Sequence, residues 1–469
     1  MTATLDQAKS TKASRDGRWI DDWQPEDRGF WDNGRKQVAR RNLTFSILSE
    51  HIGFSVWTMW SVLVLFLGLK YGFPGAKNVG KAMFHGHLVT KADVVAAAGD
   101  KFLLISLPAA IGSFVRIPYT FAVAKVGGRN WTVISALLLL VPLVATYGVL
   151  QPGVSFTTLL VCAALAGVGG GNFASSMTNI NGFYPERLKG RALGLNAGGG
   201  NLGVAAVQLV ALAVLAVEGK ALADPRDLVA IYIPLVLVAA LLSWLTMDNL
   251  SGMRNADSAL REVSRSYHTW TMSFLYIGTF GSFIGFGFAF GQTLTTQFKA
   301  DYPTPLDAAY LTFIGPLIGS LVRPVGGWLA DRFGGALVTA CTFLAMTGAA
   351  GLVLVATQRA SLPMFVLAFV LLVTLTGVGN GSTYKMIPAI FRATTDTPEQ
   401  ARRLSGALIG IAGAVGAFGG VLVNIALRQS FLHTGNAEGA YKSFIAFYVA
   451  CLVLTGVVYL RPSKRLAGV

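Results

Sequence analysis

Two arginines lie deep inside long apolar segments, where a charged side chain is costly. Arg116 precedes Lys125 by nine residues, about 13.5 Å at the helical rise of roughly 1.5 Å per residue. Arg323 precedes Asp331 by eight residues, about 12 Å on the same rise. Both positions are near the middle of an apolar layer about 30 Å thick. An arginine at that depth costs at least about 2.5–3.5 kcal/mol on insertion scales, so it is expected to face a cavity or a partner.

The acidic residues do not supply that partner in most segments, since nearly all Asp and Glu are in loops or near helix ends. The alternative is that a carboxylate or a helix C-terminus holds each arginine for structural reasons. That alternative is weaker for two arginines than for one. A guanidinium fork matches planar and polyoxygen anions. The pair therefore predicts a binding site for a small oxyanion or a carboxylate.

The elements that must position these arginines are membrane-spanning helices. Of the 469 residues, 53% are hydrophobic and only 13% are charged, against about 25% charged in soluble proteins. We expect an all-α membrane protein with twelve transmembrane helices. The apolar segments are 44–69, 98–122, 130–150, 155–183, 192–217, 227–247, 269–292, 308–330, 336–356, 362–390, 404–427 and 441–460.

The charged residues predict the orientation. The chain has 38 Lys and Arg. Of these, 24 lie in the two tails and in the loops on the tails' side of the membrane, 11 lie in the loops on the other side, and three lie inside spans. The positive-inside rule then places both termini in the cytoplasm of a multi-pass protein of the cytoplasmic (inner) membrane. This asymmetry also accounts for the net charge of +15 without a nucleic-acid partner. No cleavable signal peptide is expected, because residues 1–43 contain no apolar core.

The two halves of the chain repeat. A shift of 207 residues aligns GSFVRIPYTFAVAKVGGRNWT (112–132) with GSLVRPVGGWLADRFGGALVT (319–339), which makes Arg116 and Arg323 equivalent. A shift of 210 aligns GVGGGNFASSM (167–177) with GVGNGSTYKMI (377–387). Such parallel repeats are typical of major facilitator transporters. We expect a cytoplasmic N-terminal segment (1–43), a six-helix half (44–247), a cytoplasmic loop (248–268) and a second half with a short tail (269–469).

Several motifs resemble those of known transporters. GGWLADRFGG (326–335) is similar to the cytoplasmic loop motif of the major facilitator superfamily, and AVAKVGGR (122–129) is a degenerate copy of it. GVGGGNFASSMTNINGFYP (167–185) and GVGNGSTYKMIPAIF (377–391) resemble the paired signatures of the nitrate/nitrite porter family of NarK type. The likeness extends over essentially the whole chain, from WQPEDRGFW through ALGLNAGGGNLGV (192–204) and YIGTFGSFIGF (276–286).

The resemblance implies nitrate or nitrite bound between two arginines, which match Arg116 and Arg323. It implies aromatic rings on either side of the planar anion, matching Phe173 and Tyr384 with Phe280 nearby, and hydrogen bonds from Asn201 and Tyr276. It further implies alternating access by a monomer, with glycines that let the helices slide. The signature glycines are Gly169, Gly170, Gly171, Gly194, Gly379, Gly381 and Gly410.

The coupling mode depends on Glu50 and His51 in the first span. An intramembrane carboxylate beside a histidine is a plausible proton relay, and it favours nitrate–proton symport over nitrate/nitrite exchange. The alternative role for Glu50 is a salt bridge to Lys385 or to one of the site arginines. Lys385 is a third intramembrane cation, which would tune the charge of the site or pair with Glu50.

Other functions have less support in the sequence. A facilitator for another small anion, such as a carboxylate or a phosphate ester, stays possible on charge and depth alone. The spans contain no carboxylate pair, no Cys–His arrangement and no metal-ligand cluster, so we expect no enzyme, cofactor or metal. Cys162, Cys341 and Cys451 are interpreted as small buried apolar residues.

Overall fold

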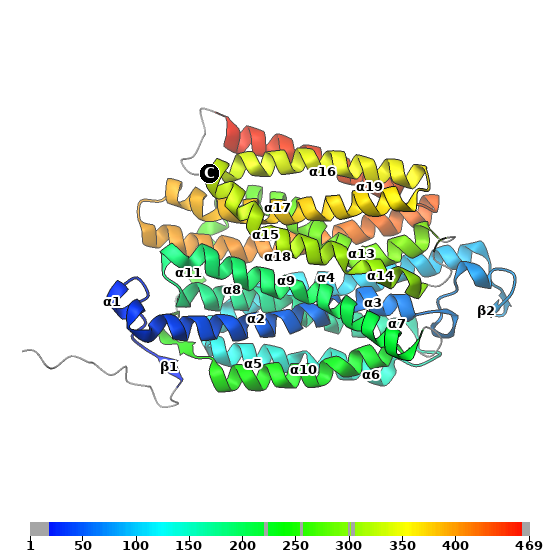
Figure 1. The fold of residues 1–469 in the computed structure, drawn as a ribbon, viewed down its shortest axis with the longest axis horizontal. Coiled ribbons are helices and arrows are strands. Elements are labelled where there is room, and N and C mark those ends of the chain that lie inside the picture. Colours follow the sequence, from blue (N-terminus) through cyan, green and yellow to red (C-terminus); the bar gives the residue numbers. More distant parts are fainter. Residues whose placement is uncertain (1–17, 220–223, 254–256, 299–300, 302–304, 462–469) are drawn as a thin grey trace, which may run out of the picture.

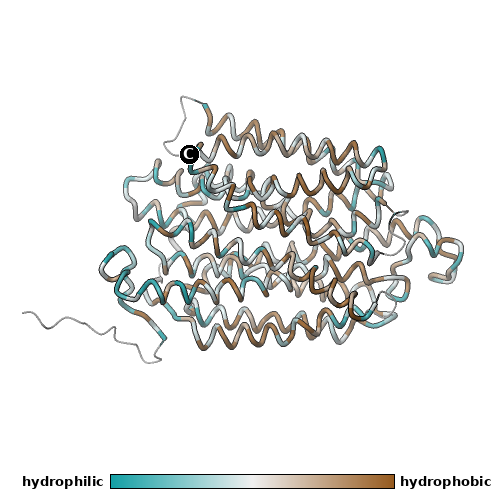
Figure 2. The backbone as a smooth tube through the Cα atoms, in the orientation of Figure 1, coloured by the Kyte–Doolittle hydropathy of each residue, from teal (hydrophilic) through white to brown (hydrophobic). Residues whose placement is uncertain are grey.

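Twelve helical spans run side by side along the long axis of the protein (Figure 1). The computed structural model describes residues 18–219, 224–253, 257–298, 301 and 305–461. Within these residues, twelve helices are long and apolar enough to cross a membrane, which confirms the expected number. The apolar residues occupy the middle of the helices, and hydrophilic residues gather at the two ends of the bundle (Figure 2).

The first six spans form one half. They comprise α1 (Arg28–Phe30), α2 (Lys36–Thr58), α3 (Trp60–Phe66), α4 (Lys91–Val126), α5 (Gly128–Leu138), α6 (Leu140–Val149), α7 (Phe156–Ala166), α8 (Asn172–Phe183), α9 (Glu186–Glu218) and α10 (Pro225–Thr246). The last six form the other: α12 (Tyr267–Tyr276), α13 (Ser282–Gln297), α14 (Ala309–Thr312), α15 (Ile314–Phe333), α16 (Gly335–Gln358), α17 (Leu362–Thr394), α18 (Pro398–Thr434) and α19 (Glu438–Thr455).

Several helices extend beyond the predicted spans. The apolar segment 98–122 is the middle of α4, which begins at Lys91, and the segment 404–427 is the middle of α18. The reason is physical: an apolar stretch reports the thickness of the membrane core, whereas polar residues continue a helix beyond it. Part of the expected N-terminal segment is likewise helical, because α2 begins at Lys36.

The internal repeat is visible in the backbone. Both α4 and α15 end on a glycine with a positive φ, 95° at Gly127 and 92° at Gly334. Only glycine adopts this conformation without strain, so these two residues, 207 positions apart, terminate equivalent helices. The halves meet in the same symmetric way, since α4 packs on α18 and α15 packs on α9.

The outside of the bundle is apolar. Large hydrophobic side chains such as Leu344 and Leu367 are exposed there, as expected of a surface that contacts lipid. Cys341 is exposed on the same kind of surface, so its predicted burial is wrong, while Cys162 and Cys451 are buried. The hydropathy of an apolar span cannot distinguish a lipid-facing side from a core-facing side.

Four short strands lie outside the helices. β1 (Trp19–Ile20) pairs in parallel with β4 (Asn249–Leu250), and β2 (Met83–Phe84) pairs with β3 (His87–Leu88) in a hairpin. The β1–β4 pair joins the N-terminal segment to the connection between the halves, which also contains α11 (Asp257–Val263). β1, α1 and α11 lie together at one end of the bundle, and β2 lies at the opposite end (Figure 1).

Five of the seven signature glycines are packing positions. A Cβ on Gly381 would overlap the backbone of Arg323 and Gly327, and comparable overlaps occur at Gly169, Gly170, Gly171 and Gly379. At Gly410 a Cβ would meet only ordinary contacts with Thr120, and at Gly194 it would meet nothing within 4 Å.

We therefore expect Gly381→Ala to destabilise the protein by about 1–3 kcal/mol through overpacking. Gly194→Ala is the matched control; it should leave stability unchanged or raise it by up to about 1 kcal/mol, since alanine favours helix. Thermal unfolding of the purified variants in detergent measures both. Equal midpoints for the two variants would contradict the packing role of Gly381.

Candidate functional site

Arg116 is fully buried on α4 and is held by backbone carbonyls. Its Nε donates to the carbonyl of Gly170 at 3.0 Å, and its Nη1 donates to the carbonyl of Gly413 at 2.7 Å. Gly170 lies in a 3₁₀ turn, Gly167–Gly171, that interrupts the fourth span between α7 and α8. The absence of a side chain there allows α4 to approach closely, because a Cβ on Gly170 would lie 2.8 Å from the Cα of Gly112.

Arg323 occupies the equivalent place on α15. Its Nη2 donates to the hydroxyl of Tyr276 at 3.1 Å, and its Cζ lies 5.6 Å from the ring centroid of Tyr384. Unlike Arg116, it is bonded within its own half, since Tyr276 ends α12. Neither arginine forms a salt bridge with a carboxylate of the described residues.

Phe280 brings the two arginines together. Its ring centroid lies 5.0 Å from the Cζ of Arg116 and 5.9 Å from that of Arg323, so the two guanidiniums approach the same aromatic ring. Phe280 belongs to a π-helical turn, Ile277–Gly281, and a turn of this kind within a helix frequently marks a functional site. The two arginines that the repeat makes equivalent are therefore brought together in the structure.

The aromatic residues implied by the family resemblance also gather here. Phe280 stacks on Phe173 at 5.9 Å and on Tyr276 at 5.2 Å, and Tyr276 lies 6.3 Å from Tyr384. Phe280 is thus central to the cluster, where the resemblance implied only that it was nearby. Trp57 was not predicted; its ring lies 5.2 Å from the Cζ of Arg116. The sequence signal that could have identified Trp57 as a site residue was its position two helical turns after Glu50 on the first span.

Several polar atoms in the site have no partner among the described residues. They are Nη2 of Arg116, Nη1 of Arg323, the hydroxyl of Tyr384 and Oε1 of Glu50. Both amide atoms of Asn201 on α9, which the resemblance assigns to the site, are also buried without a partner. Buried polar groups are normally hydrogen-bonded, because leaving one unpaired costs about 1–3 kcal/mol. The two guanidinium donors and the tyrosine and asparagine donors are therefore suited to a ligand that accepts hydrogen bonds.

Glu50 lies in a buried hydrogen-bond network on α2. Its Oε2 accepts from Ser176 at 2.5 Å and from Asn196 at 2.8 Å, and Ser176 is also 2.9 Å from Ser46. Both site arginines interact electrostatically with Glu50 without forming a salt bridge. His51 points elsewhere, with Nδ1 3.1 Å from the carbonyl of Gly199. Adjacent residues on a helix do not face the same way, so the two side chains do not form the predicted Glu–His relay.

The predicted role of Lys385 is wrong. Its ammonium pairs with the carboxylate of Asp331 at 2.5 Å, and both side chains are more than one-third exposed. Lys385 therefore neither pairs with Glu50 nor contributes a buried charge to the site. Lys385 falls inside the predicted span 362–390, but α17 packs along α15 so that Lys385 reaches the charged end of that helix.

Comparison with known proteins identifies the family. The sequence profile of the Major Facilitator Superfamily matches residues 51–424. The nitrate/nitrite transporter NarU of Salmonella typhimurium is 36% identical over 95% of this chain and 97% of its own length. The chain belongs to the nitrate/nitrite porter family of this superfamily. The probable nitrate/nitrite antiporter NarK2 of Thermus thermophilus is 34% identical over 96% of this chain and 99% of its own length.

Solved structures support the fold of the porter independently. The xylose transporter XylE from E. coli matches with a TM-score of 0.64 at 14% identity, covering 89% of this chain and 97% of that one. The human organic anion transporter MFSD10 matches with a TM-score of 0.58, again at 14% identity, covering 89% and 99%. These likenesses concern the major facilitator fold of two six-helix halves.

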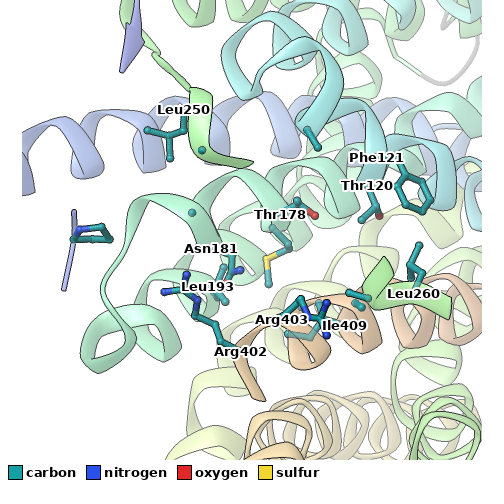
Figure 3. A pocket seen from close by; sticks show the side chains of 18 of the residues that line it. Thr120, Phe121, Thr178, Asn181, Leu193, Leu250, Leu260, Arg402, Arg403 and Ile409 are labelled. Atoms are coloured by element: carbon teal, nitrogen blue, oxygen red, sulfur yellow. The ribbon is translucent and has the colours of Figure 1, made fainter. Parts of the chain in front are cut away.

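A pocket of about 390 Å³ leads from Tyr384 in the site toward the end of the porter that carries both termini. Figure 3 shows Thr178 and Asn181 of α8 on one side of it and Arg402 and Arg403 of α18 on the other. The pocket is therefore lined by both halves, as a path along the axis between them must be.

The N-terminal segment and the connection between the halves cover this pocket. Asp21, Trp23 and Leu260 line it, and the indole of Trp23 donates to the carbonyl of Phe183 at 3.1 Å. Ion pairs reach α18 from both covering segments: Glu26 pairs with Arg402 at 3.7 Å, and Glu262 pairs with Arg403. We call these covering residues, 18–35, 249–253 and 257–263, the cap.

We expect the cap to control access to the pocket. In a Cys341→Ser background, Asn181→Cys should react slowly with a membrane-impermeant maleimide, and adding Trp23→Ala should raise the rate about tenfold, because the indole and its hydrogen bond are lost. Gel-shift labelling of membrane vesicles measures the rates. Ala393→Cys, exposed in the last turn of α17 and outside the cap, is the control; its rate should not respond to Trp23→Ala. An unchanged rate at position 181 would contradict the covering role.

Proposed function

We propose that this porter is a secondary active transporter that moves nitrate, nitrite or both across the cytoplasmic membrane by alternating access. The observation that carries the proposal is the pair of buried arginines, each with one guanidinium nitrogen unpaired and each close to the ring of Phe280. The names of the relatives supply the identity of the anion. Both termini lie in the cytoplasm, the protein works as a monomer, and it catalyses no reaction.

The arginines make binding and closure interdependent. Two guanidiniums beside one aromatic ring repel each other, and a planar anion between them would remove the repulsion while accepting the free hydrogen bonds. Phe280 lies within 6 Å of both guanidiniums, so a bound anion would lie beside this ring and against Phe173 and Tyr384. Asn201 and Tyr276 would complete its hydrogen bonds.

Arg116 also links the two halves directly. Its bond to Gly413 crosses from α4 to α18, which belong to different halves. A rocking motion of one half against the other must lengthen or replace this bond. An anion that accepts from the same guanidinium would compensate for the lost carbonyl, so loading of the site and movement of the halves are coupled through Arg116.

We expect Arg116→Lys and Arg323→Lys each to reduce nitrate uptake at least about tenfold, since lysine keeps the charge but loses a charge-assisted hydrogen bond worth about 1.5–3 kcal/mol. Proteoliposomes loaded with the purified protein and given labelled nitrate measure this effect. Arg392→Lys, on the exposed last turn of α17, is the matched control and should transport normally. Normal uptake by both site variants would refute the two-arginine site.

Glu50 is the proposed proton-coupling residue, and nitrate–proton symport is the coupling that it favours. The carboxylate is fully buried, has one oxygen without a partner, and interacts with both arginines. Protonation of Glu50 would change the charge that the arginines present to the anion. The alternative is nitrate/nitrite exchange, which needs no protonatable group and is favoured by the name of the Thermus relative.

A pH gradient imposed on proteoliposomes with no internal nitrate or nitrite distinguishes the two. Symport predicts uptake driven by the gradient, and Glu50→Gln should abolish that uptake while Glu50→Asp retains part of it. Nitrate/nitrite exchange by Glu50→Gln should persist, because the arginines are intact. Uptake that requires internal nitrite in the unmodified protein would establish exchange and remove the coupling role of Glu50.

A further inference from the structure

A second cavity, of about 300 Å³, lies at the end of the bundle opposite the termini. We call it the outer pocket. Both halves line it. The first half contributes Lys101 and its neighbours Ala97 and Ala98, and the second half contributes Gln292, Thr295 and Phe431. Like the first pocket, it opens between the halves, but it lies on the other side of the arginine site.

Lys101 is the unusual residue of the outer pocket. Its side chain is only 7% exposed, and its ammonium forms no ion pair or hydrogen bond with any residue in the part of the chain that the structure describes. Its recorded neighbour is the ring of Phe73, 5.7 Å away. Neither of the nearest acidic residues along α4 pairs with Lys101 among the described residues: Asp93 accepts from Thr90, and Asp100 forms no salt bridge with the ammonium.

No carboxylate pairs with the ammonium of Lys101 among the described residues, and the ammonium keeps access to the cavity, whereas the unpaired nitrogens of the two site arginines are fully enclosed. A cation that faces a cavity without a counter-charge is suited to an anion there. The carboxamide of Gln292, which is 3% exposed, adds a second unpaired group to the same cavity, because its Oε1 has no hydrogen-bond partner. Rotating the amide by half a turn would instead offer its N–H groups to a ligand beside Lys101.

The position of Lys101 relates the outer pocket to the arginine site. Lys101 and Arg116 are 15 residues apart on α4, about 22 Å along the helix and some 60° around it, so they lie on similar sides. Pro108 is midway between them, and its carbonyl accepts from the indole of Trp57 at 2.7 Å. Trp57 in turn packs edge-on against Phe288 of the second half at 5.3 Å. This aromatic contact separates the two sites.

We propose that the outer pocket is a second binding site for a small oxyanion, in which Lys101 captures the anion before it reaches the arginines. The inference rests on the proposed transport function and adds a step to it. The anion is held by the Lys101 ammonium and by the second N–H of the Gln292 amide, whose first N–H donates to Thr296 at 3.1 Å, while Trp57 and Phe288 are in contact. When the halves move and that contact opens, the anion passes along α4 to Arg116. Capture at a focused positive charge raises the rate of encounter on this side of the membrane only.

The test is the direction-dependence of the KM in proteoliposomes that contain the protein in one orientation. We expect Lys101→Gln to raise the KM for nitrate offered on the outer-pocket side about tenfold, the lower end of the range for charge steering. The maximal rate from that side should stay unchanged. Because detailed balance ties the two directions together, the ratio of maximal rate to KM must fall equally from the other side, which we expect as a lower maximal rate at unchanged KM. Lys101→Arg should restore these values. Lys91→Gln removes an exposed lysine from the same helix and should change none of them. A Lys101→Gln protein with the same KM from both sides as the unmodified protein would refute the capture site.

A binding measurement separates this inference from the proposed function. In Arg116→Ala/Arg323→Ala protein, which lacks the central site, sodium nitrate should raise the midpoint of thermal unfolding above that in sodium chloride of equal ionic strength. Adding Lys101→Gln or Lys101→Met should abolish that rise. If the unmodified protein transports no nitrate but this rise depends on Lys101, the transport function fails and the oxyanion site stands. Transport without any Lys101-dependent rise would overturn the site alone.

The Arg116→Ala/Arg323→Ala protein, measured with and without added lipid, identifies the source of the oxyanion. A Lys101-dependent rise with nitrate in lipid-free detergent supports the captured substrate. A Lys101-dependent rise that appears only with phosphatidylglycerol, and not with nitrate, would show that a lipid phosphate occupies the pocket, and it would overturn the capture step.

Discussion

The structure depends on the cost of burying two guanidiniums where no carboxylate pairs with them. Arg116 and Arg323 reduce that cost with what an uncharged helix bundle can offer: backbone carbonyls, a tyrosine hydroxyl and the faces of aromatic rings. Backbone carbonyls are available in the middle of a span only where the helix is irregular or its neighbour comes close. The 3₁₀ turn at Gly167–Gly171 and the π-helical turn at Ile277–Gly281 therefore lie where the charges are.

The repeat makes the arginines equivalent in position, but their surroundings are different. Arg116 bonds across the axis to Gly413, whereas Arg323 bonds to Tyr276 within its own half. Glu50, in the first half, adds a carboxylate that interacts with both. The two halves thus present one symmetric pair of charges in an asymmetric setting. Of the two site arginines, only Arg116 has a bond across the axis that must change when the halves move.

The sequence predicted what depends on position along a helix. The meeting of the two arginines followed from their equivalent places in the repeat, the number of spans followed from apolar length, and the equivalence of Gly127 and Gly334 followed from the same repeat. It could not predict what depends on rotation about the helix axis or on the neighbouring helix. Lys385 was assigned to the membrane interior and instead reaches Asp331, His51 faces away from Glu50, and Cys341 faces outward. Of the site, the residue types were predictable, whereas the central place of Phe280 and the contribution of Gly413 were not.

The pairing of β1 with β4 has a consequence for biogenesis. Trp19 and Asn249 are partners in the strand pair, yet they are separated by the entire first half of the chain. A nascent chain emerges from the ribosome N-terminus first, and its domains fold in that order. The segment around Trp19 must therefore wait without its partner until all six helices of the first half have been synthesised and inserted. The closed cap is consequently a late event in translation, and its completion reports that the first half has already been assembled.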